Sequence, residues 1–241
     1  MINFAHRGAS SDYPENTLLA FKQAIKQGAT GLELDVHKTK DHQLVVIHDE
    51  DVERTFLSSG LIKDLNWEEL RDLKCRRAMF TDSIECQMPR LEEVLELVKE
   101  HQIKLNIELK TDIFSYPGIE QDVIQLIQQY NLKNQVIISS FNPDSIKLCK
   151  AIDPTIKVGF LYYEPIINVI EYAKALNADA IHPHLRLVSE ELVQKAHENH
   201  LAVNIYTVNS PSYMRKLIDA QVDGIFTDYP ALLNEVMKEY K

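Results

Sequence analysis

The fold of this chain is decided by two apolar segments, GLELDV at residues 31–36 and LVVIHD at residues 44–49. Both are typical of β-strands, because aliphatic residues dominate them. Glu33 and Asp35 stand two residues apart, so in an extended strand their side chains leave the same face, roughly 6–7 Å apart. Carboxylates are rarely buried without a partner. The spacing therefore suits two acids that bind one cation.

Residues 38–43, between the two segments, are polar and typical of a turn. Folding the segments back on each other as a hairpin would set Asp35 about opposite His48. The imidazole would then stand beside the carboxylates. The alternative for this stretch alone is an ordinary surface hairpin whose polar residues face water, and the rest of the chain decides between the two.

Length and charge narrow the class of protein. The chain has 241 residues, 45% of them hydrophobic, which is enough for one large core, and α/β barrels of about this size commonly form a single domain. The net charge of −10 disfavours nucleic acid or an anionic membrane as the main partner. It still allows a phosphate to bind in a local cationic pocket.

The three cysteines and the start of the chain indicate a compartment. Cys75, Cys86 and Cys149 are odd in number and lack the spacing of a metal site, so we expect reduced thiols rather than a disulfide framework. The chain enters a strand almost at once, at residues 1–6, which predicts that no signal peptide precedes it. No apolar run is long enough to span a bilayer. The sequence thus predicts a soluble cytoplasmic protein without stable membrane insertion.

Eight strand-like segments alternate with amphipathic helical segments, which indicates a TIM (β/α)8 barrel. The predicted strands are Ile2–His6, Gly31–Val36, Lys104–Lys110, Gln135–Phe141, Lys157–Tyr162, Ala180–His184, Ala202–Val208 and Gly224–Asp228. The predicted helices are Asn16–Gln27, Arg90–His101, Ile119–Tyr130, Pro143–Ala151, Pro165–Leu176, Glu190–Asn199, Ser212–Ala220 and Ala231–Tyr240.

Residues 37–88 do not fit this alternation. They contain the return arm of the hairpin and several short mixed tracts, and we interpret them as a small insertion after strand two, beside the mouth of the barrel. Residues 1–241 are expected to form one barrel domain that includes this insertion.

Polar residues gather at the C-terminal ends of the predicted barrel strands, where active sites of this fold lie. Glu33, Asp35 and Glu108 offer three hard oxygen ligands from two neighbouring strands, which suits Mg²⁺ or Ca²⁺ better than zinc. The alternative is a salt-bridge cluster with Arg7 and Lys110. Metal and phosphate binding are compatible, because those two cations can neutralise an anion while the carboxylates hold the metal.

Two histidines reach the same mouth from different segments. His6 and His48 are placed as an acid and base pair requires, one to deprotonate a nucleophile and the other to protonate a leaving oxygen. His37, His182 and His184 have no chemical task, so we expect them to be structural hydrogen-bonding groups. For His37, a contact with a metal ligand is the alternative.

Two further groups have open interpretations. Asn16 or Thr17 is expected to cap the first helix, while Glu15 braces Arg7 or reaches the site. Tyr206, near the end of strand seven, either contacts the alcohol part of a substrate or fills the barrel.

Six motifs in order resemble the glycerophosphodiester phosphodiesterase family, and the resemblance covers nearly the whole chain. The motifs are Ala5-His6-Arg7-Gly8-Ala9, Glu15-Asn16-Thr17, Glu33-Leu34-Asp35-Val36, His48-Asp49, Asn106-Ile107-Glu108-Leu109-Lys110 and Tyr206-Thr207-Val208-Asn209. The family's strand-seven motif usually begins with tryptophan, and tyrosine at position 206 keeps the aromatic wall but puts the substrate preference in doubt.

The resemblance implies a metal-dependent hydrolase that converts a glycerophosphodiester and water into an alcohol and glycerol 3-phosphate. Carried over position by position, the resemblance implies roles that agree with those inferred above from residue chemistry and spacing. These are one divalent cation, Mg²⁺ or Ca²⁺, on Glu33, Asp35 and Glu108; acid and base catalysis by His6 and His48; and phosphate binding by Arg7 and Lys110. Tyr206, which departs from the family's motif, is the further candidate for substrate binding.

Two routes and two competing functions stay open at this point. The nucleophile is either the neighbouring glycerol hydroxyl, through a cyclic phosphate, or water. The competing functions are a lysophospholipase D-type phospholipid diesterase, which would need an apolar surface at the mouth, and a non-catalytic phosphoester-binding barrel. The apolar residues of the insertion are spaced as a small internal core, which favours a soluble substrate. These residues are Phe56, Leu57, Leu61, Ile62, Trp67 and Phe80.

Overall fold

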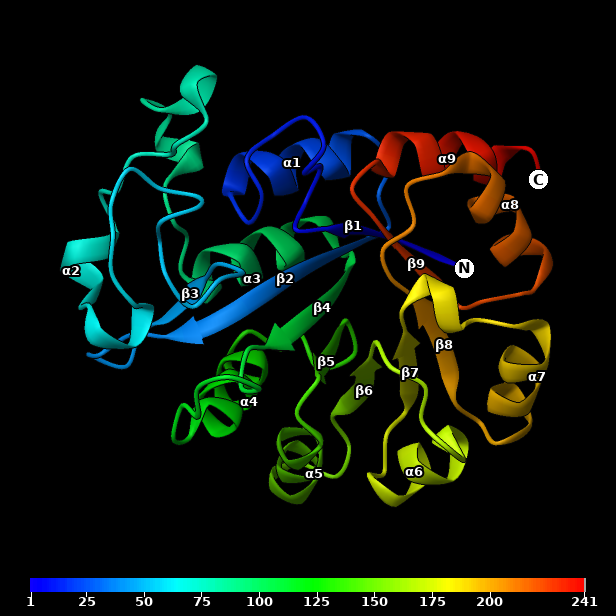
Figure 1. Cartoon of the computed structure of the whole chain (residues 1–241). Coiled ribbons are helices and arrows are strands. Elements are labelled where there is room, and N and C mark those ends of the chain that lie inside the picture. Colours follow the sequence, from blue (N-terminus) through cyan, green and yellow to red (C-terminus); the bar gives the residue numbers. More distant parts are fainter. Residues whose placement is uncertain (241) are drawn as a thin grey trace.

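The computed structural model describes residues 1–240 and contains a closed ring of parallel strands surrounded by helices (Figure 1). The ring runs β1-β9-β8-β7-β6-β5-β4-β2, and a further pairing of β1 with β2 closes it. All of these neighbours are parallel. Among the strands within residues 1–240, only β3 pairs antiparallel, with the C-terminal residues of β2. The predicted TIM (β/α)8 barrel is thereby confirmed.

The strands and helices follow the predicted alternation. The strands are β1 Ile2–His6, β2 Gly31–Lys38, β3 Leu44–Val46, β4 Lys104–Leu109, β5 Val136–Ser140, β6 Lys157–Tyr162, β7 Ala180–Pro183, β8 Ala202–Ile205 and β9 Gly224–Thr227. The helices are α1 Leu18–Lys26, α2 Trp67–Leu70, α3 Leu91–His101, α4 Ile119–Gln129, α5 Pro143–Ile152, α6 Val169–Ala175, α7 Glu190–Glu198, α8 Pro211–Asp219 and α9 Pro230–Lys238. Short 3₁₀ turns lie at Ile62–Asp64, Ala78–Phe80, Ile84–Cys86 and Leu185–Leu187.

Helix α3 illustrates how the outer layer is held. Its apolar residues recur every three or four positions and form one stripe that packs on the barrel. The fully buried residues of this stripe are Leu91, Val94, Leu95 and Val98. At the first turn, the Glu93 carboxylate accepts a hydrogen bond from the backbone N–H of Arg90 at 2.8 Å, which satisfies one otherwise free donor of the helix start.

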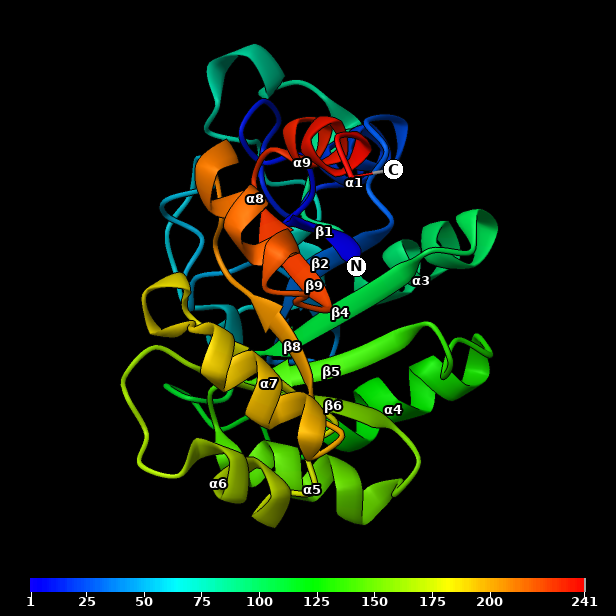
Figure 2. The same ribbon diagram turned by 90° about the vertical axis from the view of Figure 1, so that its right-hand side faces the viewer.

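Helices from the two ends of the chain complete the layer. α1 and α9 lie side by side in both views (Figures 1 and 2). The Asn234 amide donates to the carbonyl of Gln27 at 3.4 Å across this contact. Among the described residues, every helix is too short or too polar to cross a membrane. The three cysteines are buried free thiols.

Strand β2 is buried along its whole length, and its two faces differ. Leu32, Leu34 and Val36 join the hydrophobic core between the strands and the helices, whereas Glu33 and Asp35 point to the other side. The acidic pair therefore occupies positions in the barrel that would ordinarily carry apolar side chains.

Strand β3 and the segment after it contribute a small hydrophobic cluster that is separate from the main core. Its buried members are Val45, Ile47, Val52, Phe56, Ile62, Leu70 and Met88. Trp67 packs against this cluster, as its spacing predicted, but Leu57 is 52% exposed. The division of the chain into a barrel and an insertion at residues 37–88 stays a prediction.

The hairpin prediction needs a correction of one residue. The pairing of β2 with β3 sets Val36 opposite Val46, and the backbone N–H of Ile47 donates to the carbonyl of Asp35 at 3.1 Å. Asp35 is thus opposite Ile47 rather than His48. Regular pairing stops at Val46, so the chain is free to turn before His48.

Candidate active site

A cavity of about 190 Å³ lies at the C-terminal ends of the barrel strands. The charged and polar residues that line it include His6, Arg7, Glu33, His48, Asn106 and Glu108. The rest of the lining, which is mostly aromatic and apolar, consists of Phe141, Leu161, His184, Tyr206, Thr207 and Phe226. Of the predicted site residues, only Asp35 and Lys110 are missing from this lining, and they contact Arg7 and Glu108, which belong to it.

The three predicted acids converge. β2 and β4 pair in a register that sets Asp35 opposite Glu108, and one carboxylate oxygen from each of Glu33, Asp35 and Glu108 lies within 4.8 Å of the others. All three are buried. Asp35 Oδ1 accepts no hydrogen bond from any residue between 1 and 240. Hard oxygen donors packed this closely, one of them without a hydrogen bond, fit a divalent cation such as Mg²⁺ or Ca²⁺.

The three buried acids repel one another electrostatically. Burial raises the pKa of Glu33 well above its ordinary value, and the negative charges of Asp35 and Glu108 raise it further. Burial also raises the pKa of Glu108, although Lys110 partly offsets this. For Asp35, the nearby cations of Arg7 and Lys110 outweigh burial and hold its pKa far below the usual range. A divalent cation at this position would relieve the mutual repulsion.

Arg7 and Lys110 lie beside the acids. Arg7 Nε is 3.3 Å from Asp35 Oδ2, and Lys110 Nζ is 2.9 Å from Glu108 Oε1 and 4.0 Å from Asp35 Oδ1. Burial opposes the charge of both cations, but the surrounding carboxylates raise the pKa of each above its ordinary value. Both side chains therefore stay positive, and the salt-bridge contacts considered from the sequence are present together with the acidic cluster.

The loop after β1 places Arg7. Gly8 has φ of +85°, and a Cβ on it would lie 2.7 Å from the backbone of Ala20, so the tight turn needs glycine here. This turn directs the backbone N–H of Arg7 to Glu33 Oε2 at 2.8 Å. Further along the loop, Thr17 caps α1 by accepting from the N–H of Ala20, so it takes the cap that the sequence assigned to either Asn16 or Thr17.

The neighbours of this cap contact the site. The Asn16 amide donates to Asp35 Oδ2 at 2.9 Å, and Glu15 Oε1 accepts from Arg7 Nη1 at 3.0 Å. The expected bracing of Arg7 by Glu15 is thus present, and Asn16 orients an acid of the cluster instead of capping the helix.

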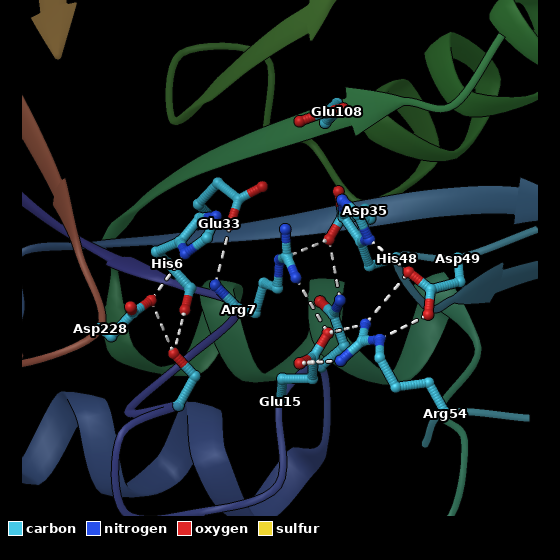
Figure 3. Close-up of polar contacts among 12 residues, drawn as sticks. His6, Arg7, Glu15, Glu33, Asp35, His48, Asp49, Arg54, Glu108 and Asp228 are labelled. Carbon is cyan, nitrogen blue, oxygen red and sulfur yellow. Dashed lines mark hydrogen bonds and ion pairs between the residues drawn. The ribbon is translucent and has the colours of Figure 1, made fainter. Parts of the chain in front are cut away.

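Each of the two predicted catalytic histidines has a carboxylate partner, and the two pairs flank Arg7 (Figure 3). His6 Nδ1 lies 2.7 Å from Asp228 Oδ1, and His48 Nδ1 lies 2.6 Å from Asp49 Oδ1. A carboxylate on Nδ1 fixes the orientation of the ring and leaves Nε2 to exchange protons with a bound molecule.

Sequence reasoning assigned no role to either partner. Asp49 follows His48 directly, and Asp228 follows the last strand, so their places in the chain were the available signal. Asp228 also accepts hydrogen bonds from Ser10 Oγ at 3.0 Å and Asn209 Nδ2 at 2.6 Å.

The remaining histidines differ in their surroundings. His37 is buried between the Tyr116 hydroxyl and the carbonyl of His48, and burial lowers its pKa to about 4. His182 is fully buried and hydrogen-bonds the Asn204 amide, and burial lowers its pKa to about 3. Both have the structural surroundings that the sequence predicted. His184 makes a structural contact too, because its Nδ1 accepts a hydrogen bond from the backbone N–H of Arg186 at 3.2 Å, but it also lines the cavity.

The apolar side of the cavity is built around Tyr206. Its ring meets Phe141 edge-on at 5.9 Å and His184 at 5.6 Å, and its hydroxyl donates to the carbonyl of Tyr162 at 2.9 Å. The hydroxyl is thus engaged by the barrel, whereas the ring faces the cavity. Phe141 and Leu161 complete this wall, and sequence reasoning did not single them out.

A family model described as the glycerophosphoryl diester phosphodiesterase family matches residues 6–232, which include all of the site residues described above. The chain belongs to this family. The predicted resemblance and the predicted enzyme class, a phosphodiester hydrolase, are thereby confirmed.

Similar proteins agree in sequence and in structure. A glycerophosphodiester phosphodiesterase of Caldanaerobacter subterraneus is 41% identical, with 97% of both chains covered. One of Bacillus altitudinis is 39% identical, over 99% of this chain and 98% of the relative. An Oleispira antarctica phosphodiesterase, solved in complex with the product sn-glycerol-3-phosphate, is 27% identical with a TM-score of 0.87, over 98% of this chain and 96% of that one.

Proposed function

We propose that this chain hydrolyses glycerophosphodiesters to an alcohol and glycerol 3-phosphate. The observation that supports this most directly is the placement of three buried acids between two His-Asp pairs around one cavity. The names of the similar proteins and the bound product in the Oleispira antarctica phosphodiesterase support the same substrate class.

Glu33, Asp35 and Glu108 would hold one divalent cation, Mg²⁺ or Ca²⁺. When bound, such an ion supplies positive charge that stabilises the negative charge developing on phosphate oxygens. The fit rests on the donor set, which is all oxygen, and on the raised pKa of Glu33, because a cation favours the ionised form that burial disfavours.

Arg7 and Lys110 would bind the non-bridging oxygens of the phosphate, since both remain charged and lie next to the acids. The apolar wall around Tyr206 would contact the carbon skeleton of the substrate. Binding in this orientation places the ester bond between the two histidines.

His6 and His48 would perform the proton transfers. One Nε2 accepts the proton of the attacking hydroxyl as its oxygen bonds to phosphorus, and the other donates a proton to the alcohol oxygen as the P–O bond breaks. If the nucleophile is the neighbouring glycerol hydroxyl, a cyclic phosphate forms and water opens it with the two roles reversed. If it is water, glycerol 3-phosphate forms directly.

The test is release of glycerol 3-phosphate from glycerophosphocholine and related diesters, with Mg²⁺, with Ca²⁺ and with a chelator. His6→Ala and His48→Ala are each expected to lower turnover by about 10²–10⁴-fold while the fold survives. His101→Ala, at the exposed end of α3, is the matched control and should retain full activity. Near wild-type turnover in both site variants would refute the assignment.

Two further substrates separate the alternatives. A diester without the neighbouring hydroxyl should be a poor substrate if the reaction passes through a cyclic phosphate, and efficient hydrolysis would favour attack by water. Faster hydrolysis of a lysolipid than of glycerophosphocholine would indicate a lysophospholipase D-type enzyme. A protein that is stabilised by the diester but never releases product would be a binding protein.

A further inference from the structure

Arg54 connects two carboxylates that belong to different parts of the site (Figure 3). It lies between β3 and α2, eight residues into the segment that follows β3. Its Nε and Nη2 donate to the two oxygens of Asp49 at 2.5 and 3.2 Å. Its Nη1 and Nη2 donate to the two oxygens of Glu15 at 2.7 and 2.8 Å. One guanidinium thus makes a bidentate contact with each acid, a geometry that lysine cannot reproduce.

Each of these carboxylates leads to a different functional group. Asp49 Oδ1 also binds Nδ1 of His48, and Glu15 Oε1 also binds Nη1 of Arg7. Arg54 itself does not line the 190 Å³ cavity; together with Glu15 it lines another cavity, of about 170 Å³. Its side-chain hydrogen bonds therefore connect it to the site through these two acids.

We infer that Arg54 is a positioning residue that sets His48 for proton transfer and Arg7 for phosphate binding at the same time. This inference rests on the proposed function. Without Arg54, Asp49 and Glu15 lose a shared cation and become free to rotate toward water, and the two groups that they orient lose their support. A displacement of about 1 Å in a positioned catalytic group can lower a rate by about 10²-fold.

The surroundings of Arg54 separate positioning from a purely structural role. Its side chain is 48% exposed, and exposed ion pairs contribute little to folding stability. Burial would raise the pKa of both Asp49 and Glu15, but the hydrogen bonds from Arg54 help to keep both below their ordinary values. Both acids thus stay ionised as acceptors, and loss of Arg54 should affect the chemistry more than the fold.

The experiment compares Arg54→Gln with single changes in each branch. Turnover reports on the branch through Asp49 to His48, and the dissociation constant of sn-glycerol 3-phosphate, measured by calorimetry, reports on the branch through Glu15 to Arg7. We expect Asp49→Asn to lower kcat and Glu15→Gln to weaken binding of sn-glycerol 3-phosphate. Arg54→Gln should do both, by at least about 10-fold in each.

Double variants test whether Arg54 acts through these acids. In the Asp49→Asn background, Arg54→Gln should weaken binding of sn-glycerol 3-phosphate without lowering kcat further. In the Glu15→Gln background, Arg54→Gln should lower kcat without weakening binding of sn-glycerol 3-phosphate further. Arg54→Lys, which keeps the charge, should restore only part of the loss. Arg71→Gln, an exposed arginine of the same segment with surface ion pairs, is the control and should leave both quantities unchanged.

Three outcomes would overturn the inference: a folded Arg54→Gln protein with wild-type kcat and affinity, full additivity in both double variants, or complete rescue by lysine. If Arg54→Gln does not fold, the Arg54→Lys variant alone tests the inference. Wild-type kcat and affinity for sn-glycerol 3-phosphate in that variant would show that the bidentate contacts are not needed. If the wild-type protein releases no glycerol 3-phosphate, the proposed function fails. Arg54 is then judged by the affinity measurement alone.

Discussion

Changing Asp228 to asparagine replaces one carboxylate oxygen by an NH₂ group, and so tests the contact between Asp228 and His6. Asp228 accepts hydrogen bonds on both oxygens: Oδ1 faces His6 Nδ1 and Ser10 Oγ, and Oδ2 faces Asn209 Nδ2 at 2.6 Å. An asparagine must place its NH₂ group on one side or the other. Either orientation replaces an acceptor by a donor, so the surrounding hydrogen bonds cannot all be kept.

With its NH₂ group toward His6, the asparagine would force the proton of the imidazole from Nδ1 to Nε2. Nε2 could then no longer accept a proton. With the NH₂ group toward Asn209, two donors would meet, and Asn209 cannot rotate away easily because its Oδ1 already accepts from Thr227 Oγ1 and from the backbone N–H of residue 228. The first orientation is therefore favoured, and it disables His6 as a base.

The expected loss in kcat is about 10²–10⁴-fold, which corresponds to about 2.7–5.4 kcal/mol of barrier. The same carboxylate-to-amide change in the serine-protease triad costs about 10⁴-fold. The assay is steady-state release of glycerol 3-phosphate, with circular dichroism to verify the fold. Asp219→Asn, an exposed change of the same chemistry, is the control. A folded Asp228→Asn protein with kcat within about threefold of wild type would contradict the role of this pair.

Three further results are expected. Glu33→Gln should raise the free energy of unfolding in chelator, because it removes one of three buried charges that repel one another. The same change should lower turnover by about 10²–10³-fold. A lower free energy of unfolding in chelator would contradict this. Glu33 and Glu108 have higher pKa values in the folded protein than in the unfolded chain, so the folded protein is most stable when both are protonated. This stability is fully present below the pKa of the unfolded chain and is lost as the pH rises through the pKa of the folded protein. The rise in Tm caused by Mg²⁺ or Ca²⁺ should therefore grow as the pH rises above 4.5, the ordinary pKa of glutamate. A flat response in thermal-shift measurements would count against the metal site. Leu95→Ala, in the buried stripe of α3, should cost about 2–5 kcal/mol in denaturant titrations and leave kcat unchanged, whereas a loss of kcat with little loss of stability would contradict a purely structural role.

Most of the fold could be predicted because each strand and helix carries its own periodic signal. The largest errors lie where the backbone departs from that signal. β8 was expected to continue to Val208 but ends at Ile205, and α6 was expected from Pro165 but begins at Val169, after Asn168 adopts a left-handed conformation. Such departures depend on tertiary contacts, which periodicity does not report.

The predicted acids and histidines meet at one cavity because parallel strands place their C-terminal ends at one rim. Their supporting residues were harder to find. Asp228 lies 222 positions from His6 and reaches it only because β9 closes the ring against β1. Arg54 lies in an irregular segment without periodicity, so its two bidentate contacts are visible only in three dimensions.

The separate hydrophobic cluster after β3 has a consequence for inactivation by heat. His48 and Asp49 lie between two of its members, Ile47 and Val52, and are anchored by a much smaller core than the one that holds the barrel. Regions with few buried apolar contacts open locally at a lower free-energy cost than the main core of the same protein. Catalysis should therefore cease several degrees before the helical circular-dichroism signal melts, and should return on cooling while the barrel is still intact.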